Sequence, residues 1–203
     1  MGVTPQQFEQ MKSRLDKPQR ATASPVFESS FKPVTSSHKI ILGVDPSLRG
    51  TGFGVIQMAK PHPLVLAQGT IHCPAGWERS RCLAKIHQTL RDIVAKTRPS
   101  ACAIEGLFHA HNLQTALIMG EARGAALAAV AEYGLDIYEI APRKMKQAIV
   151  GYGAAQKIAV AKMVQRMLHL PEPPAPDAAD ALALAISFAQ EMGRFGLNPP
   201  KKV

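Results

Sequence analysis

Residues 39–57, KIILGVDPSLRGTGFGVIQ, decide the fold that the sequence predicts. The run Lys39–Val44 is mostly large, apolar and β-branched, a composition typical of a strand buried on both faces. It stops at Asp45, and the turn-forming residues that follow lead into a second apolar strand, roughly Thr51–Met58. Such a hairpin leaves the Asp45 carboxylate at the end of a central strand. On this stretch alone, a capping role for Asp45 at the turn is equally consistent with the pattern.

The length and composition of the chain favour one basic domain. Its 203 residues suit a single domain plus a tail. Lys and Arg total 24 against 15 Asp and Glu, a net charge of +9, which favours a polyanionic partner such as nucleic acid. The three cysteines lack CxxC spacing, which disfavours a zinc site or disulfide framework and favours a reducing cytosolic compartment. An uncharged apolar run of about 18 residues and an apolar signal region are both absent from the sequence, so we expect no membrane partner and no secretion.

Composition also predicts where the folded domain lies. Residues 1–38 are expected to be a disordered or partly helical N-terminal arm, because their second half is rich in Ser, Thr and Pro. Residues 39–192 carry the periodic apolar patterns of a folded domain. Residues 193–203 are expected to form a short basic C-terminal tail.

The apolar patterns of residues 39–192 predict an α/β fold. After the hairpin, we expect strands at 64–72, 101–104 and 136–140 and helices at 77–96, 112–133, 156–168 and 177–190. Three strands before the first helix, followed by right-handed crossovers, give a five-stranded mixed sheet flanked by helices.

Four acids stand where a shared site is expected. Asp45 and Glu105 end two apolar strands, while Asp177 and Asp180 lie on one face at the start of the last helix. Asp177 alone could be a stabilising first-turn acid, but Asp180 continues toward the apolar side, where an unpaired carboxylate is costly. Four converging carboxylates would require divalent cations, and hard oxygen ligands suit Mg²⁺ or Mn²⁺. With the basic surface, this pattern indicates metal-dependent phosphodiester chemistry.

Five separated motifs resemble, in order and spacing, the RuvC Holliday-junction resolvases of bacteria. They are GVDPSLRGTGFGVI (43–56), AIEGLF (103–108), MGEARGAALAAV (119–130), MKQ (145–147) with VGYGAAQK (150–157), and PDAADALALAI (176–186). The resemblance covers about residues 39–188. It implies an RNase H-like fold and a homodimeric cytoplasmic enzyme of bacterial type. Such enzymes cut four-way DNA junctions with paired symmetric nicks in homologous recombination and DNA repair.

The same resemblance implies roles for individual residues. The catalytic and metal-holding acids would be Asp45, Glu105, Asp177 and Asp180, with two Mg²⁺ per site, Mn²⁺ as a substitute and products that carry 5′ phosphates. Phe108 matches an aromatic position that stacks on bases near the junction centre. Lys146 and Lys157 match basic positions that contact DNA near the cut. The basic segment adds Arg143 and Lys144 as DNA-binding candidates, and a branch-migration motor complex is a further candidate partner.

The 112–133 helix is expected to form a two-fold dimer interface. It carries more apolar surface than one sheet face can cover, and Gly120 and Gly124 would permit close approach of a second helix. The expected interface residues are Leu113, Leu117, Gly120 and Gly124. Packing of both glycines against the chain's own sheet is equally open on the residues alone. The resemblance favours the dimer, because a four-way junction has two symmetric strands to cut.

Three other protein classes share parts of the sequence pattern. GVDPSLRGTG also resembles the phosphate-binding turn of actin-like and sugar-kinase ATPases, but those need two such domains and this chain has room for one. A YqgF-type RNase H-like protein shares the opening aspartate but is not expected to have the DAADALA and MGEARGAAL helices. A junction-binding protein without cleavage is disfavoured by the presence of all four acids. His109 and His111, next to Phe108, are disfavoured as metal ligands, because loop histidines near DNA are more often surface residues.

Overall fold

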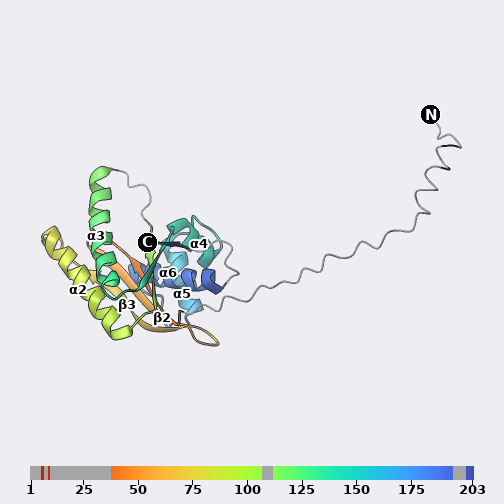
Figure 1. Ribbon diagram of the computed structural model, residues 1–203, viewed down its shortest axis with the longest axis horizontal. Coiled ribbons are helices and arrows are strands. Elements are labelled where there is room, and N and C mark those ends of the chain that lie inside the picture. The colour runs from red at the N-terminus through yellow and green to blue at the C-terminus, as the bar shows by residue number, and fades with distance from the viewer. Residues whose placement is uncertain (1–5, 7–8, 10–37, 107–111, 194–199) are drawn as a thin grey trace. The chain divides into compact units, whose positions relative to one another are not determined.

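The structure, a computed structural model, describes residues 6, 9, 38–106, 112–193 and 200–203. The described part of the unit Pro33–Val203 forms one mixed sheet with helices on both of its faces (Figure 1). The strands lie in the order β3-β2-β1-β4-β5-β6. The predicted α/β architecture is therefore confirmed.

The sheet begins as an antiparallel meander and continues with parallel strands. Its strands are β1 (Ile40–Asp45), β2 (Gly50–Gln57), β3 (Leu64–His72), β4 (Ala101–Glu105), β5 (Asp136–Ile140) and β6 (Lys201–Lys202). β1 pairs in parallel with β4, and β4 pairs in parallel with β5. The sheet has six strands and not the five predicted, because two residues of the basic tail pair antiparallel with β5. These two lysines are exposed, so β6 has no apolar pattern that the sequence could have revealed.

The helices follow the predicted order with one addition. They are α2 (Arg79–Thr97), α3 (Leu113–Ala131), α4 (Pro142–Val150), α5 (Lys157–Met167) and α6 (Pro176–Gly193). The addition is α4, which contains the segment that the sequence showed only as basic. Met145 and Ile149 are its buried residues, and their spacing of four was the available signal. None of the helices in the described part of the chain is long and apolar enough to cross a membrane.

Two apolar cores lie on opposite faces of the sheet. α2 and α3 cover one face and α4, α5 and α6 cover the other (Figure 1). Along β1, Ile41 belongs to the core under α6 and Leu42 to the core under α2 and α3, as expected for side chains that alternate between faces. Helix α6 is the most deeply placed helix, with every residue from Ala178 to Phe188 buried. The three cysteines are buried free thiols.

Glycines in β1 and β2 allow α6 to lie directly on the sheet. A Cβ atom added at Gly43 would lie 1.9 Å from the backbone oxygen of Ala181, and one added at Gly52 would lie 2.0 Å from the backbone oxygen of Asp177. Any other residue at either position would therefore push the helix away from the strands. This close contact fixes the first turn of α6 beside the end of β1.

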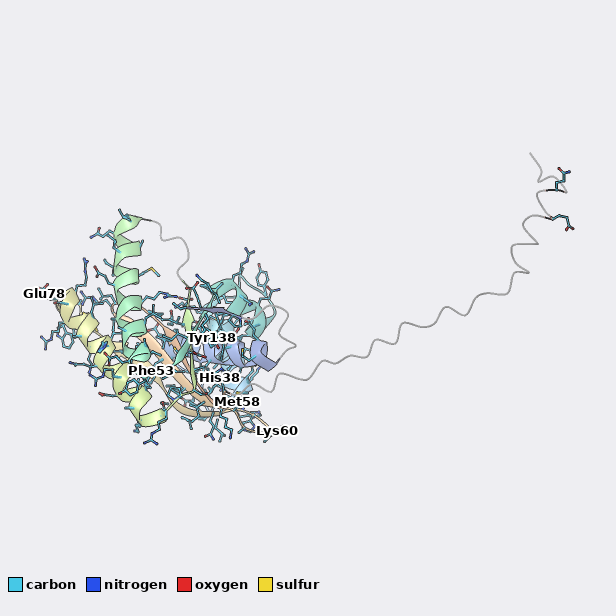
Figure 2. All side chains as sticks on the ribbon, viewed as in Figure 1. His38, Phe53, Met58, Lys60, Glu78 and Tyr138 are labelled. Carbon is cyan, nitrogen blue, oxygen red and sulfur yellow. The ribbon has the colours of Figure 1, made fainter. Side chains whose placement is uncertain are left out.

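Aromatic side chains hold the second half of α6 against β5. The ring centroid of Phe188 lies 4.7 Å from that of Tyr138, and the ring centroid of His38 lies 6.2 Å from that of Tyr138. Figure 2 shows His38 and Tyr138 near one another at this side of the sheet. Aromatic pairs at these separations add packing energy beyond area burial. Helix α6 is thus anchored at both ends.

Candidate functional site

Asp45 and Glu105 lie at the same end of two neighbouring parallel strands. Asp45 is the last residue of β1 and Glu105 is the last residue of β4, and the register pairs Val44 with Ile104 just before them. Because side chains alternate along a strand, both carboxylates follow buried neighbours and turn to the face that α6 covers. The sequence prediction that these acids end two apolar strands is confirmed, and the structure adds that the two strands are neighbours.

The turn after Asp45 is held by its own side chains and by the next loop. The hydroxyl of Thr51 donates to the Ser47 carbonyl at 2.6 Å and accepts from the Ser47 amide at 3.2 Å. The guanidinium of Arg49 donates to the carbonyls of Pro74 at 2.6 Å and Trp77 at 3.1 Å. These bonds fix the exit of the chain from β1 and so limit the movement of Asp45.

Helix α6 brings the other two acids to this end of the sheet. Asp177 is in its first turn, and its Oδ2 atom lies 3.0 Å from the position that a Cβ of Gly50 would occupy. Asp180 is 6 % exposed. Its Oδ2 lies 3.1 Å from the Nζ of Lys157, and its Oδ1 is buried with no hydrogen-bond partner among the described residues. A buried carboxylate oxygen without a partner is costly and favours the binding of a cation.

Burial and the closeness of the acids raise the pKa values of Asp45 and Glu105. Burial, then the charge of Glu105 and a hydrogen bond with it, then the charge of Asp180 raise the pKa of Asp45 to about 9, against a smaller opposite effect of Lys157. Burial is also the main cause that raises the pKa of Glu105, with a contribution from Asp180. Asp45, Glu105 and Asp180 are therefore close enough to repel one another as carboxylates.

Two of the four predicted basic residues lie beside these acids. Burial lowers the pKa of Lys157, but Asp180, Asp45 and Asp177 outweigh it and raise that pKa overall. Lys146 is half-buried in α4 and close enough to Glu105 to lower the pKa of that carboxyl. Both lysines thus add positive charge at the acidic end of the sheet.

The other two basic candidates contact different parts of the chain. The Nζ of Lys144 lies 3.0 Å from the carboxylate of Glu191, near the end of α6. Arg143 is exposed, and its Cγ would lie 2.7 Å from a Cβ at Gly153. A direct role for either residue in DNA binding stays a prediction.

Some predicted features lie outside what the structure describes. Phe108, His109 and His111 fall within residues 107–111, which are not among the described residues. Within residues 38–106, 112–193 and 200–203, no three Asp, Glu, His or Cys side chains are arranged as they lie to hold one metal ion. The metal-ligand roles of the four acids therefore stay predictions.

Helix α3 presents an exposed face that carries the four predicted interface residues. Leu113 is 76 % exposed and Leu117 is 57 % exposed. A Cβ added at Gly120 or Gly124 would meet no atom within 4 Å. The buried residues of α3 are on its other side: Ala122, Arg123, Ala126, Ala129 and Val130. The alternative in which both glycines pack against the chain's own sheet is therefore wrong.

Sequence reasoning missed one charged residue that reaches the end of β4. Arg123 of α3 is buried, forms an ion pair with Glu139 of β5 and donates a hydrogen bond to the backbone oxygen of Glu105. A single arginine in an alanine-rich helix carries no signal of its partner, because Glu139 lies on a separate strand. Its presence on the buried side of the helix was detectable only from the structure.

Comparisons with known proteins agree with this geometry. The family model of the crossover junction endodeoxyribonuclease RuvC matches residues 41–188. A RuvC from Geobacter metallireducens is 42 % identical over 153 residues, which cover 75 % of this chain and 93 % of the relative. One from Bordetella parapertussis is 45 % identical over 149 residues, which cover 73 % and 82 %.

A solved structure agrees at the level of the fold. The structure of T. thermophilus RuvC in complex with a Holliday junction substrate is 32 % identical and matches with a TM-score of 0.73. It covers 81 % of this chain and 100 % of that chain. The predicted resemblance to the RuvC resolvases and the RNase H-like fold that it implies are thereby confirmed. This chain belongs to the RuvC family of crossover junction endodeoxyribonucleases.

Proposed function

We propose that this protein is a divalent-metal-dependent endonuclease that resolves four-way DNA junctions by paired symmetric nicks. The observation that carries the proposal is the group Asp45, Glu105 and Asp180, three carboxylates crowded at the ends of β1, β4 and α6. Buried like charges at one place destabilise a fold unless a cation or a proton neutralises them, so such a group indicates a functional site. Membership of the RuvC family and the junction substrate in the T. thermophilus structure support the choice of reaction and substrate.

The acids fit hard divalent cations. Their donors are all carboxylate oxygens, one oxygen of Asp180 lacks a partner, and burial together with the neighbouring acids raises the pKa of Asp45 to about 9. Oxygen-only donors favour Mg²⁺, with Mn²⁺ as a substitute. When bound, two such ions supply a hydroxide nucleophile and stabilise charge on the phosphodiester. We expect Asp45, Glu105, Asp177 and Asp180 to hold them.

The lysines would bind and orient the DNA strand. Lys157 is paired with Asp180 through Nζ although its side chain is 61 % exposed, so it can turn from the carboxylate to a phosphate without unfolding α5. Lys146 lies close enough to Glu105 to lower the pKa of that carboxyl. Point charges beside the acids would hold the strand in place and offset charge that develops at the phosphate.

A homodimer through the exposed face of α3 would place two such sites on one junction. This face, defined by Leu113, Leu117, Gly120 and Gly124, is apolar and uncovered in the single chain. Exposed leucines in a row favour burial against a partner. An isologous pair has two-fold symmetry, as a four-way junction does, so both symmetric strands would be cut.

The remaining expectations concern location and partners. We expect the protein to act in the cytoplasm of a bacterium, since its relatives are bacterial. A branch-migration motor stays a candidate partner. Residues 1–40, which include the predicted arm, and residues 189–203 lie outside the matched family region.

The decisive experiment is cleavage of a synthetic four-way junction labelled on each strand. With Mg²⁺ we expect symmetric nicks whose products can be religated, and with EDTA we expect binding without nicks. A linear duplex of the same sequence is the control. Binding without cleavage in Mg²⁺ would favour a junction-binding protein, and equal cutting of the duplex would favour another RNase H-like nuclease.

A further inference from the structure

Arg123 reaches the end of the sheet that carries the acids, from the face opposite to α6. Its side chain comes from α3, on the face of the sheet opposite to α6, and the residue is only 7 % exposed. Its Nε donates to the backbone oxygen of Glu105 at 3.3 Å, and its Nη2 pairs with the carboxylate of Glu139. One guanidinium therefore joins α3, β4 and β5 immediately behind the acids.

The backbone after Glu105 is packed against the same ion pair. A Cβ added at Gly106 would lie 3.1 Å from Cγ of Glu139, so a side chain there would require the Glu139 side chain to shift by a few tenths of an ångström. The amide of Gly106 donates to the Ile140 oxygen at 2.9 Å. The peptide between Glu105 and Gly106 is thus held on one side by β5 and at its oxygen by Arg123.

Packing alone gives no reason for a charged residue at this place. A buried guanidinium is costly to desolvate, and an apolar side chain would fill the space between α3 and the sheet at lower cost. What arginine adds is a planar fork whose Nε and Nη atoms can bond two acceptors in a fixed geometry. Lysine carries its three donors on a single nitrogen, so it lacks the separate Nε and Nη2 donors that reach the Glu105 oxygen and the Glu139 carboxylate here.

We propose that Arg123 is a positioning residue for the cleavage reaction. It fixes the Glu105–Gly106 peptide from the α3 side, and the orientation of that peptide sets the direction in which the Glu105 carboxylate leaves β4 toward the acids on the α6 side. The inference rests on the proposed function, because it assigns Glu105 to the catalytic group.

Two variants separate positioning from stability. Arg123→Lys keeps a positive charge for the Glu139 carboxylate but loses the bond from Nε to the Glu105 oxygen. Glu139→Gln weakens the ion pair but leaves that bond in place. A merely structural role predicts that cleavage follows stability in both variants, whereas positioning predicts that only Arg123→Lys loses cleavage.

The measurements are the single-turnover cleavage rate of a bound four-way junction, junction affinity in EDTA, thermal unfolding and amide hydrogen exchange at Gly106. For Arg123→Lys we expect unchanged affinity, faster exchange and a rate lowered by about tenfold to a hundredfold, as for small misplacements of a reacting group. For Glu139→Gln we expect a lower melting temperature, near wild-type exchange and a rate within about threefold of wild type.

The outcomes keep this inference apart from the proposed function. If the wild type does not cut junctions, the proposed function fails. If the wild type cuts and Arg123→Lys cuts equally well, or both variants lose cleavage in proportion to stability, the positioning role is wrong. Should Arg123→Lys not fold, the double variant Arg123→Gln with Glu139→Gln removes both charges of the ion pair together. The same loss of cleavage rate and the same faster amide exchange at Gly106 are then expected.

Discussion

The ammonium nitrogen of Lys157 lies 3.1 Å from Oδ2 of Asp180, which joins a side chain that is 61 % exposed to one that is 8 % exposed. Among the residues that the structure describes, this lysine is the only cation that forms an ion pair with Asp45, Glu105, Asp177 or Asp180. It therefore offsets part of the repulsion at the end of the sheet when no metal is bound.

Lys157→Met should destabilise the protein in EDTA. The buried Asp180 carboxylate would lose its partner, and an unsatisfied buried polar group costs about 1–3 kcal/mol, with a larger cost for a charged one. Urea unfolding in EDTA measures the change in the free energy of unfolding. Lys162→Met is the matched control, because Lys162 is exposed in the same helix and forms no ion pair within the described residues. Equal stability of the two variants would contradict a stabilising role for the Lys157–Asp180 pair.

The protein in EDTA should lose stability as the pH rises. The pKa of Asp45 is about 9 in the folded state against 3.8 as its ordinary value, so the folded state retains a proton that the unfolded state releases. The contribution of Asp45 to the free energy of unfolding is then fully present below pH 3.8 and is lost as the pH rises toward about 9. The loss is at most about 1.4 kcal/mol per pH unit for this group. Glu105 acts in the same direction, since its pKa is also raised.

Asp45→Asn should flatten this pH dependence, because the amide does not titrate. Urea unfolding of both proteins in EDTA at about pH 5 and about pH 8 measures the contribution of Asp45 together with its effect on Glu105, which shares a hydrogen bond with it. The variant should gain most relative to wild type at the higher pH. A constant difference between the two proteins at both pH values would show that Asp45 ionises normally in the folded state.

Asp45→Asn should also abolish cutting and leave junction binding intact. The amide is a poor ligand for a hard cation, while the basic residues that hold phosphates are unchanged. Gel-shift affinity in EDTA and cleavage with Mg²⁺ measure the two properties. Asp136→Asn is the control and should cut like wild type. Asp136 begins β5, at the end of the sheet away from Glu105, and pairs with Lys202. Cleavage by Asp45→Asn within about tenfold of wild type, or about 1.4 kcal/mol of barrier, would remove Asp45 from the catalytic group.

Gly124→Leu should prevent self-association. Its side chain would fill the space that a second α3 helix needs, and overpacking of this kind costs about 1–3 kcal/mol. Sedimentation at micromolar concentration and the fraction of junctions cut on both strands measure the effect. Gly193→Leu is the control, because Gly193 is also a helix glycine with open space around it but lies at the end of α6. A wild type that is monomeric and still cuts both strands would show that the dimer model is wrong.

The sequence alone determined the elements that carry the acids. Apolar runs that stop at Asp45 and Glu105 predicted the ends of β1 and β4, and the predicted bounds of β3 and β5 agree with the structure. These features are local, because a strand or helix is recorded in the periodicity of its own residues. The family could also be inferred, since five motifs retain their order and spacing.

Only the tertiary structure decided how these elements meet. Gly52 lies within the second strand that the sequence predicts, but its own segment gives no sign that it admits the backbone of α6, which carries two of the acids. Lys144 and Lys146 belong to one basic segment and look alike in sequence, yet one pairs with Glu191 and the other lies near Glu105. Arg123 gives no sign of its contact with the Glu105 backbone. Each of these relationships joins segments far apart in the chain, and it is packing between segments, not the periodicity of either one, that sets which side chains face each other.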